Sequence, residues 1–157
     1  MRTEISAKPG TTRIKTMEIK KLSTEYIRAA AEIERACFSS PWDEAALQAE
    51  FDNPCAHLSV ALDGDKAAGY AAVYCVCGEA DIARIAVLPE YRRQGIATRL
   101  LLKSFEEIAA DCVFLDVRQS NTAAICLYKS LGFVQIGTRK NYYSNPTENA
   151  ILMKREN

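Results

Sequence analysis

The chain has 157 residues, a formal net charge of zero and a single histidine. This length fits one domain with a hydrophobic core, and 48% hydrophobic and 25% charged residues are ordinary globular values. The charge balance argues against a protein that binds nucleic acid or an anionic membrane. The sequence has no apolar run long enough to span a membrane and no apolar N-terminal segment typical of a signal peptide, so we expect a cytoplasmic protein.

The start of the chain differs in composition from the rest. Six basic and two acidic residues stand among the first 21, which gives this stretch a net charge of +4. Residues 1–15 also carry Pro9-Gly10 and few apolar side chains. We therefore predict a flexible basic extension over residues 1–15 and a single domain over residues 16–157.

Six cysteines are present, most of them inside apolar periodic segments. They form no C-x-x-C pattern, and the single histidine cannot complete a usual Cys/His zinc set. We therefore expect buried thiols in a reducing compartment and no metal site.

Hydrophobic periodicity and turn residues predict the elements of the first half of the chain. For the second predicted helix, Ser40 would be the N-cap, Pro41 the first helical residue and Asp43 the reciprocal cap, with the end at Asn53-Pro54. The other predicted elements of this half are a strand over about 16–22, a helix over 24–37, and strands over 57–62, 66–77 and 79–88.

The second half alternates helices and strands. A helix from about Ile96 to Ala109 is followed by a β-rich strand, Val113–Arg118. Ser120-Asn121 caps a further helix, and Gly132 ends it as the C-cap. Two short strands close the chain, one after Phe133 and one around 150–154. The predicted order is β-α-α-β-β-β-α-β-α-β-β, which indicates a mixed α/β sheet.

A short basic loop separates an apolar strand from the helix that opens at Ile96. It contains Arg92, Arg93, Gln94 and Gly95. N–H groups at a helix start lack intrahelical partners, and the helix dipole makes that end positive. A glycine lets the backbone approach a ligand, and arginines add planar cationic donors. The loop therefore indicates a phosphate or pyrophosphate site, but it fits neither G-x-x-x-x-G-K-[ST] nor G-x-G-x-x-G.

A second group of polar residues lies between Phe114 and Phe133. Alternation places Asp116 on the same face of its strand as Phe114 and Arg118, and a carboxylate in an apolar strand is costly unless it has a partner or a task. Asn121 and Tyr128 are seven residues apart and share one face of the following helix. Because the link between strand and helix is short, Asp116, Asn121 and Tyr128 could converge.

The segment R-x-x-G-x-A, from Arg92 to Ala97, resembles the acetyl-coenzyme A signature of the GNAT-type N-acetyltransferases. The run D-V-R-x-S-N-x-x-A-I-x-L-Y-x-x-L-G-F, which begins at Asp116, is similar to the ribosomal-protein-alanine N-acetyltransferase branch of that family. The resemblance covers roughly residues 17–155. It implies the GNAT acyl-CoA N-acyltransferase fold. It also implies an enzyme that transfers an acetyl group from acetyl-CoA to a protein N-terminal α-amine, which could belong to a ribosomal protein. The transfer would take place directly in a ternary complex, without an acyl-enzyme.

The resemblance also implies a role for individual residues. Tyr128 would protonate the departing thiolate, and Asp116 stands where that branch has a glutamate acting as base. Asp is one methylene shorter, so Glu79 is a second candidate for the base. The implied substrate-binding residues are Trp42, Tyr142 and Tyr143, and no metal is implied. The residues that would bind the coenzyme are Ile85, Ala86, Val87, Arg93, Gln94, Gly95, Ile96, Ala97, Thr98 and Asn121.

Alternatives to these roles stay open at the sequence level. Tyr128 could be a packing residue, Asn121 only a helix cap, Asp116 a partner of Arg118, and Glu79 a solvated charge. The fold could also serve an acetyltransferase for lysine or small-molecule amines, or a catalytically weak acyl-CoA-binding module, which the shorter carboxylate makes plausible.

Overall fold

The computed structural model describes residues 17–157, so the predicted extension over residues 1–15 lies outside the described residues. The elements follow the predicted order, with short 3₁₀ turns at Thr24–Tyr26 and Pro89–Tyr91. They are β1 (Met17–Lys21), α1 (Ile27–Cys37), α2 (Glu44–Asp52), β2 (Ala56–Asp63), β3 (Lys66–Val76), β4 (Glu79–Val87), α3 (Ile96–Glu107), β5 (Cys112–Arg118), α4 (Thr122–Ser130), β6 (Val134–Tyr143) and β7 (Glu148–Glu156).

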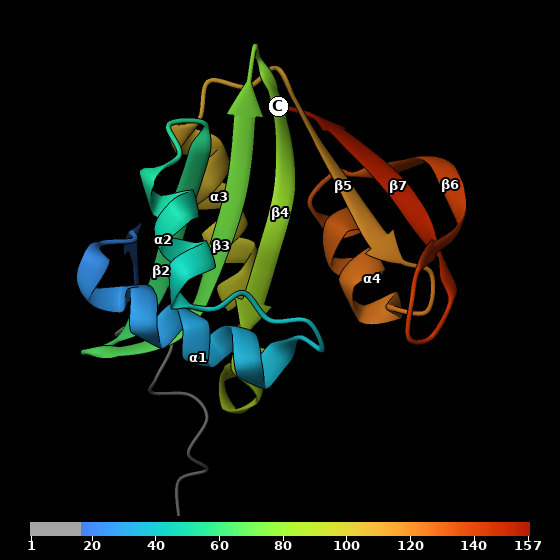
Figure 1. Cartoon of the computed structure of the whole chain (residues 1–157). Helices are drawn as coiled ribbons and strands as arrows, with labels where there is room; N and C mark the ends of the chain where they lie inside the picture. Colours follow the sequence, from blue (N-terminus) through green and yellow to red (C-terminus); the bar gives the residue numbers. More distant parts are fainter. Residues whose placement is uncertain (1–16) are drawn as a thin grey trace, which may run out of the picture.

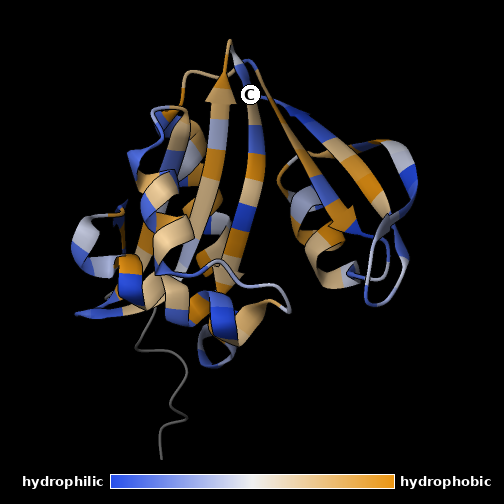
Figure 2. Ribbon diagram, viewed as in Figure 1, coloured by the Kyte–Doolittle hydropathy of each residue, from blue (hydrophilic) through white to orange (hydrophobic). Residues whose placement is uncertain are grey.

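The strands form one mixed sheet of seven, in the order β1-β2-β3-β4-β5-β7-β6. Helices α1 and α2 pack on one face of its first half and α3 on the opposite face (Figure 1). The central strand β3 is therefore buried on both sides, and Figure 2 shows mainly apolar residues along it. Helix α4 shares an apolar cluster with α3 and β5, which places it on the α3 side.

Strands β4 and β5 are parallel neighbours that pair over only three residues, Glu79 with Cys112, Ala80 with Val113 and Asp81 with Phe114. Beyond that point they diverge, as Figure 1 shows, and we call the opening between residues 82–87 and 115–118 the fork. Strand β5 pairs along its whole length with β7 instead. The fork therefore leaves one edge of β4 without a strand partner near the centre of the sheet.

A buried carboxylate fixes the connection between α1 and α2. Glu34 has no exposed surface, and Tyr70 donates a short hydrogen bond to it from β3. The Arg84 Nε lies 3.4 Å from Glu34 Oε1, and the Trp42 backbone N–H donates to Oε2 at 2.9 Å. The Arg84 guanidinium also lies 4.6 Å from the rings of both Phe38 and Trp42. Side chains from α1, β3 and β4 thus hold the α1–α2 loop against the sheet.

The structure corrects three of the sequence-based predictions. Helix α2 begins after Asp43, whose side chain accepts the Ala46 N–H at 2.8 Å, so Ser40 is not its cap. The closing strands are not short, since β6 has ten residues and β7 nine. The thiols are mostly not buried: Cys112 is, while Cys37 and Cys75 are partly buried and the other three cysteines (Cys55, Cys77 and Cys126) are exposed.

Candidate active site

A loop over residues 88–95, which includes the 3₁₀ turn Pro89–Tyr91, joins the end of β4 to the N-terminus of α3. Gly95 is the N-cap with φ 75°, a left-handed conformation that favours glycine, and a Cβ there would meet no atom within 4 Å. The Arg99 N–H donates to the Gly95 carbonyl at 3.1 Å. Because this is the first bond of an α-helix, the N–H groups of residues 96–98 have no acceptor in the helix. They form a set of donors without helical partners at the positive end of the α3 dipole.

The side chains of the same loop support this geometry. Arg92 Nε donates to the Val87 carbonyl at 3.0 Å, and Arg99 Nη2 donates to the Met17 carbonyl at 2.7 Å. These two arginines therefore tie the loop and the helix to β4 and β1. The side-chain amide oxygen of Gln94 is buried and has no hydrogen-bond partner within residues 17–157. This orphaned atom is an acceptor, so only a hydrogen-bond donor, such as an amide N–H of a ligand, could satisfy it.

The edge of β4 at the fork offers backbone groups to a ligand. The Leu88 N–H donates to the Ala68 carbonyl at 2.8 Å, which makes this a hydrogen-bonded pair of the β3–β4 ladder. Such pairs alternate, so Ala86 also bonds toward β3, whereas Ile85 and Val87 direct their backbone groups away from β3, and the Val87 carbonyl among them already accepts from Arg92 Nε. An irregularity at Ala83, which has no partner in the β3 register, shifts this strand just before that stretch.

Helix α4 and its N-cap carry two further predicted site residues, Asn121 for coenzyme binding and Tyr128 as the acid. Asn121 is the N-cap of α4, and its Oδ1 accepts the Ala124 N–H at 3.2 Å, which leaves its amide NH₂ as a donor. Tyr128 is 6% exposed, and its ring packs edge-on to Phe133 with 5.7 Å between centroids. Burial, and then the neighbouring Tyr143, raises the pKa of Tyr128 to about 12. Its phenol is therefore protonated throughout the neutral range.

A cavity of about 620 Å³ opens on the α1–α2 side of the sheet, where β4 and β5 begin to diverge. Its charged lining residues are Glu79 and Asp81 on β4, Asp116 on β5 and Arg139 on β6. We call it the acidic cavity. The rest of its wall is mainly apolar or aromatic, contributed by Tyr74, Val76, Cys77, Ala80, Phe114, Leu115, Ile136, Leu152 and Met153.

The carboxylates in this cavity influence one another. Desolvation, and then the negative charge of Asp116, raises the pKa of Asp81, while Arg139 acts in the opposite direction. Desolvation and the charge of Asp116 also raise the pKa of Tyr143. Tyr143 therefore lies within electrostatic reach of both Asp116 and Tyr128.

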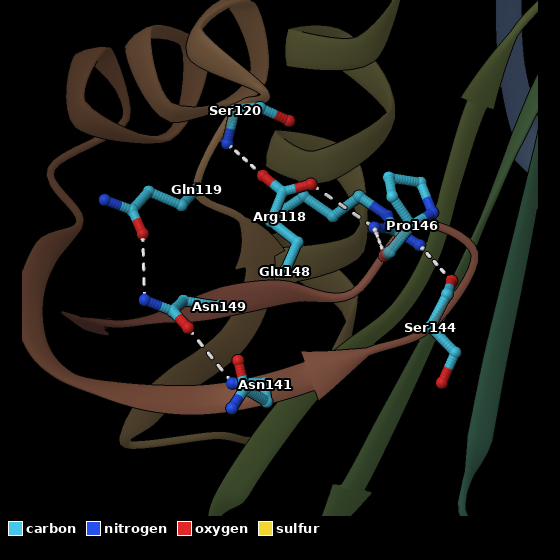
Figure 3. Close-up of polar contacts among 8 residues, drawn as sticks. All are labelled: Arg118, Gln119, Ser120, Asn141, Ser144, Pro146, Glu148 and Asn149. Carbon is cyan, nitrogen blue, oxygen red and sulfur yellow. Dashed lines mark hydrogen bonds and ion pairs between the residues drawn. The ribbon is translucent and has the colours of Figure 1, made fainter.

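A charged clamp holds the β6–β7 hairpin beside this site (Figure 3). Arg118, the last residue of β5, lies 3.3 Å from Glu148 and donates to the carbonyls of Pro146 at 3.1 Å and Ser144 at 3.0 Å. The other oxygen of Glu148 accepts the Ser120 N–H just before α4. The pair Arg118–Glu148 thus joins the hairpin to the turn that precedes α4. The ion-pair partner of Arg118 is therefore Glu148, rather than Asp116 as in the alternative considered from the sequence.

A side-chain amide reinforces the same junction in Figure 3. Asn149 Oδ1 accepts the Asn141 N–H at 3.0 Å, and its Nδ2 donates to the Gln119 side chain at 3.2 Å. The Arg118 guanidinium lies 4.5 Å from the Tyr143 ring, so the position of this tyrosine depends on the clamp.

The three predicted substrate-binding residues lie at different places. Tyr142 is 50% exposed and Tyr143 partly buried, and their rings meet edge-on at the end of β6 with 5.1 Å between centroids. Trp42 packs against Arg84 and the apolar cluster under α1, and it is not among the residues that line the acidic cavity. The α1–α2 loop that carries Trp42 is nevertheless fixed to β4 by Glu34 and Arg84.

A family model described as "Acetyltransferase (GNAT) family" matches residues 27–133. The chain belongs to the GNAT acetyltransferase family. This acetyltransferase is 36% identical over 140 residues to the "[Ribosomal protein bS18]-alanine N-acetyltransferase" of Escherichia coli K12, a match that covers 86% of the chain and 94% of the relative. It is 33% identical over 144 residues to the "N-alpha-acetyltransferase RimI" of Mycobacterium tuberculosis, which covers 88% and 91%.

A crystal structure of the ribosomal-protein-S18-alanine N-acetyltransferase from Escherichia coli is similar to this acetyltransferase with a TM-score of 0.82 and 34% identity, covering 89% of this chain and 93% of that one. The predicted family, the GNAT fold and the acetyltransferase activity class are therefore confirmed.

Sequence reasoning did not find all of the charged residues of this acetyltransferase site. It placed Asp116 and Glu79, which both line the acidic cavity, but not Asp81 and Arg139. Asp81 lies in an alternating strand, where an exposed acidic residue is ordinary, and only the register with β5 places it beside Asp116. Among residues 17–157 no group of three or more His, Cys, Asp or Glu side chains is arranged to hold a metal ion, and no helix is long and apolar enough to span a membrane.

Proposed function

We propose that the acetyltransferase transfers an acetyl group from acetyl-CoA to the α-amine at the N-terminus of a protein, with a ribosomal protein as the substrate class. The observation that carries this proposal is the identity of 36% and 33%, over most of both chains, to enzymes whose names specify N-terminal acetylation. The acidic cavity supports it, because an amine enters mostly as a cation and three carboxylates line that cavity.

The donor is proposed to bind across the fork. The unpaired amides of residues 96–98 after the Gly95 N-cap fit a pyrophosphate, with Arg93 and the α3 dipole supplying positive charge and Gln94 able to donate only through its side-chain NH₂ group. The stretch Ile85, Ala86 and Val87 would hold the pantetheine arm: Ile85 and Val87 can bond an extended amide chain at the open β4 edge as a strand would, while Ala86 between them bonds to β3. Asn121 would contact the coenzyme through its free NH₂ group.

The proposed reaction is direct attack in a ternary complex. Asp116, with Glu79 as the second candidate, takes a proton from the α-ammonium group, and the freed lone pair attacks the thioester carbonyl. A backbone N–H in the stretch 85–87 stabilises the developing oxyanion. Tyr128 donates its proton to the departing sulfur as the C–S bond breaks. Its pKa of about 12 makes it a weak acid but a fully protonated hydrogen-bond donor at neutral pH.

An α-amine suits a site with modest proton acceptors. Its ordinary pKa of about 7.7–8.0 leaves roughly 10–20% neutral at pH 7, against about 0.04% for a lysine with a pKa near 10.4. The demand on the base is therefore several hundred times smaller. Tyr142 and Tyr143 on the hairpin and Trp42 on the α1–α2 loop are proposed to border the peptide, and we place the reaction in the cytoplasm.

The test is incubation with acetyl-CoA and a peptide library in which each sequence has a free or a blocked N-terminus, read by mass spectrometry. We expect acetylation only where the N-terminus is free. Transfer to internal lysines or to polyamines in preference would instead support the small-amine alternative. Binding of acetyl-CoA in calorimetry without transfer to any amine would support a coenzyme-binding module.

A further inference from the structure

A second carboxylate on the wall of the acidic cavity lies beside Asp116, and its position follows from strand register. Asp81 is opposite Phe114 in the last paired rung before the fork, and Asp116 is two residues farther along β5. In parallel pairing, residues opposite each other point to the same face, and so do residues two apart on one strand. Asp81 and Asp116 are therefore diagonal neighbours on one face, and both line the cavity.

Sheet geometry gives the scale of this arrangement. A strand spacing of about 4.8 Å and a rise of about 3.3 Å per residue separate diagonal Cβ atoms by about 8 Å in paired strands, and this is a lower limit here because β4 and β5 diverge just after Asp81 and Phe114. Two short carboxylates that lean toward one another across this gap leave room for one ammonium group or one water. Glu79 is opposite Cys112, four residues from Asp116 and so about 13 Å away along the strand. Asp81 is therefore much better placed than Glu79 to act together with Asp116.

We propose that Asp81 and Asp116 together accept the proton of the substrate ammonium group, so that Asp81 is a further catalytic residue of this acetyltransferase. The inference rests on the proposed function only in requiring an amine substrate. Two nearby carboxylates cannot both ionise freely, so one of them becomes a stronger proton acceptor than an isolated aspartate. This offsets the shorter reach of Asp116, which takes the place of the glutamate expected from the family resemblance.

The proton balance of the step is complete without another reactant. One proton passes from the ammonium nitrogen to the Asp81–Asp116 pair, directly or through one water, and leaves to solvent when the product departs. The lone pair then forms the C–N bond. The nitrogen loses a second proton to solvent after that bond forms, and Tyr128 gives one proton to the sulfur and regains one from solvent.

Other charged groups face the pair from the neighbouring strands. Arg139 on β6 opposes the negative charge of Asp81, and Tyr74 on β3 lies within electrostatic reach of the same carboxylate. Tyr143 faces Asp116 from β6. The raised pKa of Asp81 is consistent with this environment, in which desolvation and Asp116 outweigh the single arginine.

Two measurements test the proposal, one of which needs no activity. In the free protein, carboxyl NMR titration should show Asp81 releasing its proton above the ordinary range for aspartate, and Asp116→Asn should move that titration to lower pH. In the pH profile of kcat, Asp81→Asn should lower kcat at pH 7 by 10- to 100-fold and shift the acid limb to lower pH, because the carboxyl group with the raised pKa is then absent. Asp81→Glu should recover part of the loss.

Asp65→Asn is the matched control, since Asp65 is exposed in the β2–β3 turn away from the cavity. Its kcat profile should equal that of the wild type. If Asp81→Asn changes thermal stability but neither kcat nor its acid limb, Asp81 only balances the charge of Arg139, and the proposal is wrong. If the wild type acetylates a polyamine but no peptide N-terminus, the proposed function fails while the same profile, measured with the polyamine, still decides the role of Asp81. A wild type that acetylates no amine overturns both.

Discussion

Replacing Arg84 should lower the stability of the fold, because the buried Glu34 carboxylate then loses its cationic partner. In Arg84→Met the side chain keeps most of its apolar contact with Phe38 and Trp42, but Glu34 loses the cation 3.4 Å away. Breaking one partner of a buried ion pair costs about 3–5 kcal/mol. Because Tyr70 and the Trp42 N–H still donate to Glu34, we expect the lower end, about 3 kcal/mol.

For a chain of this length, each kcal/mol lowers Tm by about 2–4 °C, so Arg84→Met should melt about 6–12 °C below the wild type in scanning calorimetry. The double variant Glu34→Gln with Arg84→Met should lose less than the two single changes added together. The control is Lys66→Met, which removes an exposed ion pair with Glu90 at 3.4 Å and should leave Tm close to that of the wild type. A melting point for Arg84→Met within 2 °C of the control would refute the reasoning.

Three further predictions follow from the site and its surroundings. Tyr128→Phe should lower kcat with little change in the calorimetric Kd for acetyl-CoA; an unchanged kcat would remove Tyr128 from the acid role. Arg118→Leu should raise the peptide KM about tenfold, equivalent to about 1.4 kcal/mol, while the donor Kd stays within about twofold; an equal loss of both would mean general unfolding of the site. Burial lowers the pKa of His57 below its ordinary 6.5, so the imidazole binds a proton more readily in the unfolded chain than in the folded one. The stability of the fold therefore falls as the pH drops from 6.5 through the lowered pKa of the folded state. His57→Gln should therefore lose less Tm than the wild type between pH 7.5 and pH 5, and parallel curves would contradict this.

The order of the elements was predictable because each has a clear period and clear ends. The α4 cap at Asn121 and the positive φ of Gly132 follow from local chemistry that a sequence displays. The start of α2 was not predictable in this way. The pattern Ser40-Pro41 is typical of a helix start, but the Trp42 N–H donates to Glu34 of α1, and the helix begins only after Asp43.

The site itself was predictable to the extent that its residues stand in motifs. Asp116, Asn121 and Tyr128 belong to one contiguous run, and Gly95 to another. Asp81, Arg84 and Arg139 belong to neither, and they become visible only through strand register and the irregularity at Ala83, which single-sequence periodicity does not specify. The burial of the cysteines was misjudged because a turn such as that at Cys77, or the outer side of a helix such as that at Cys126, looks apolar in sequence.

The fork has a consequence for the lifetime of the protein as well as for its chemistry. Three rungs between β4 and β5 are the only ladder that joins the two halves of the described sheet, so a molecule that spans the opening acts as a brace between them. A ligand that binds only the folded chain adds about 2.7 kcal/mol at a concentration one hundred times its Kd. Bound acetyl donor would then add to the apolar cluster of α3, β5 and α4 in holding the halves together, so saturation with the donor should make their separation rarer.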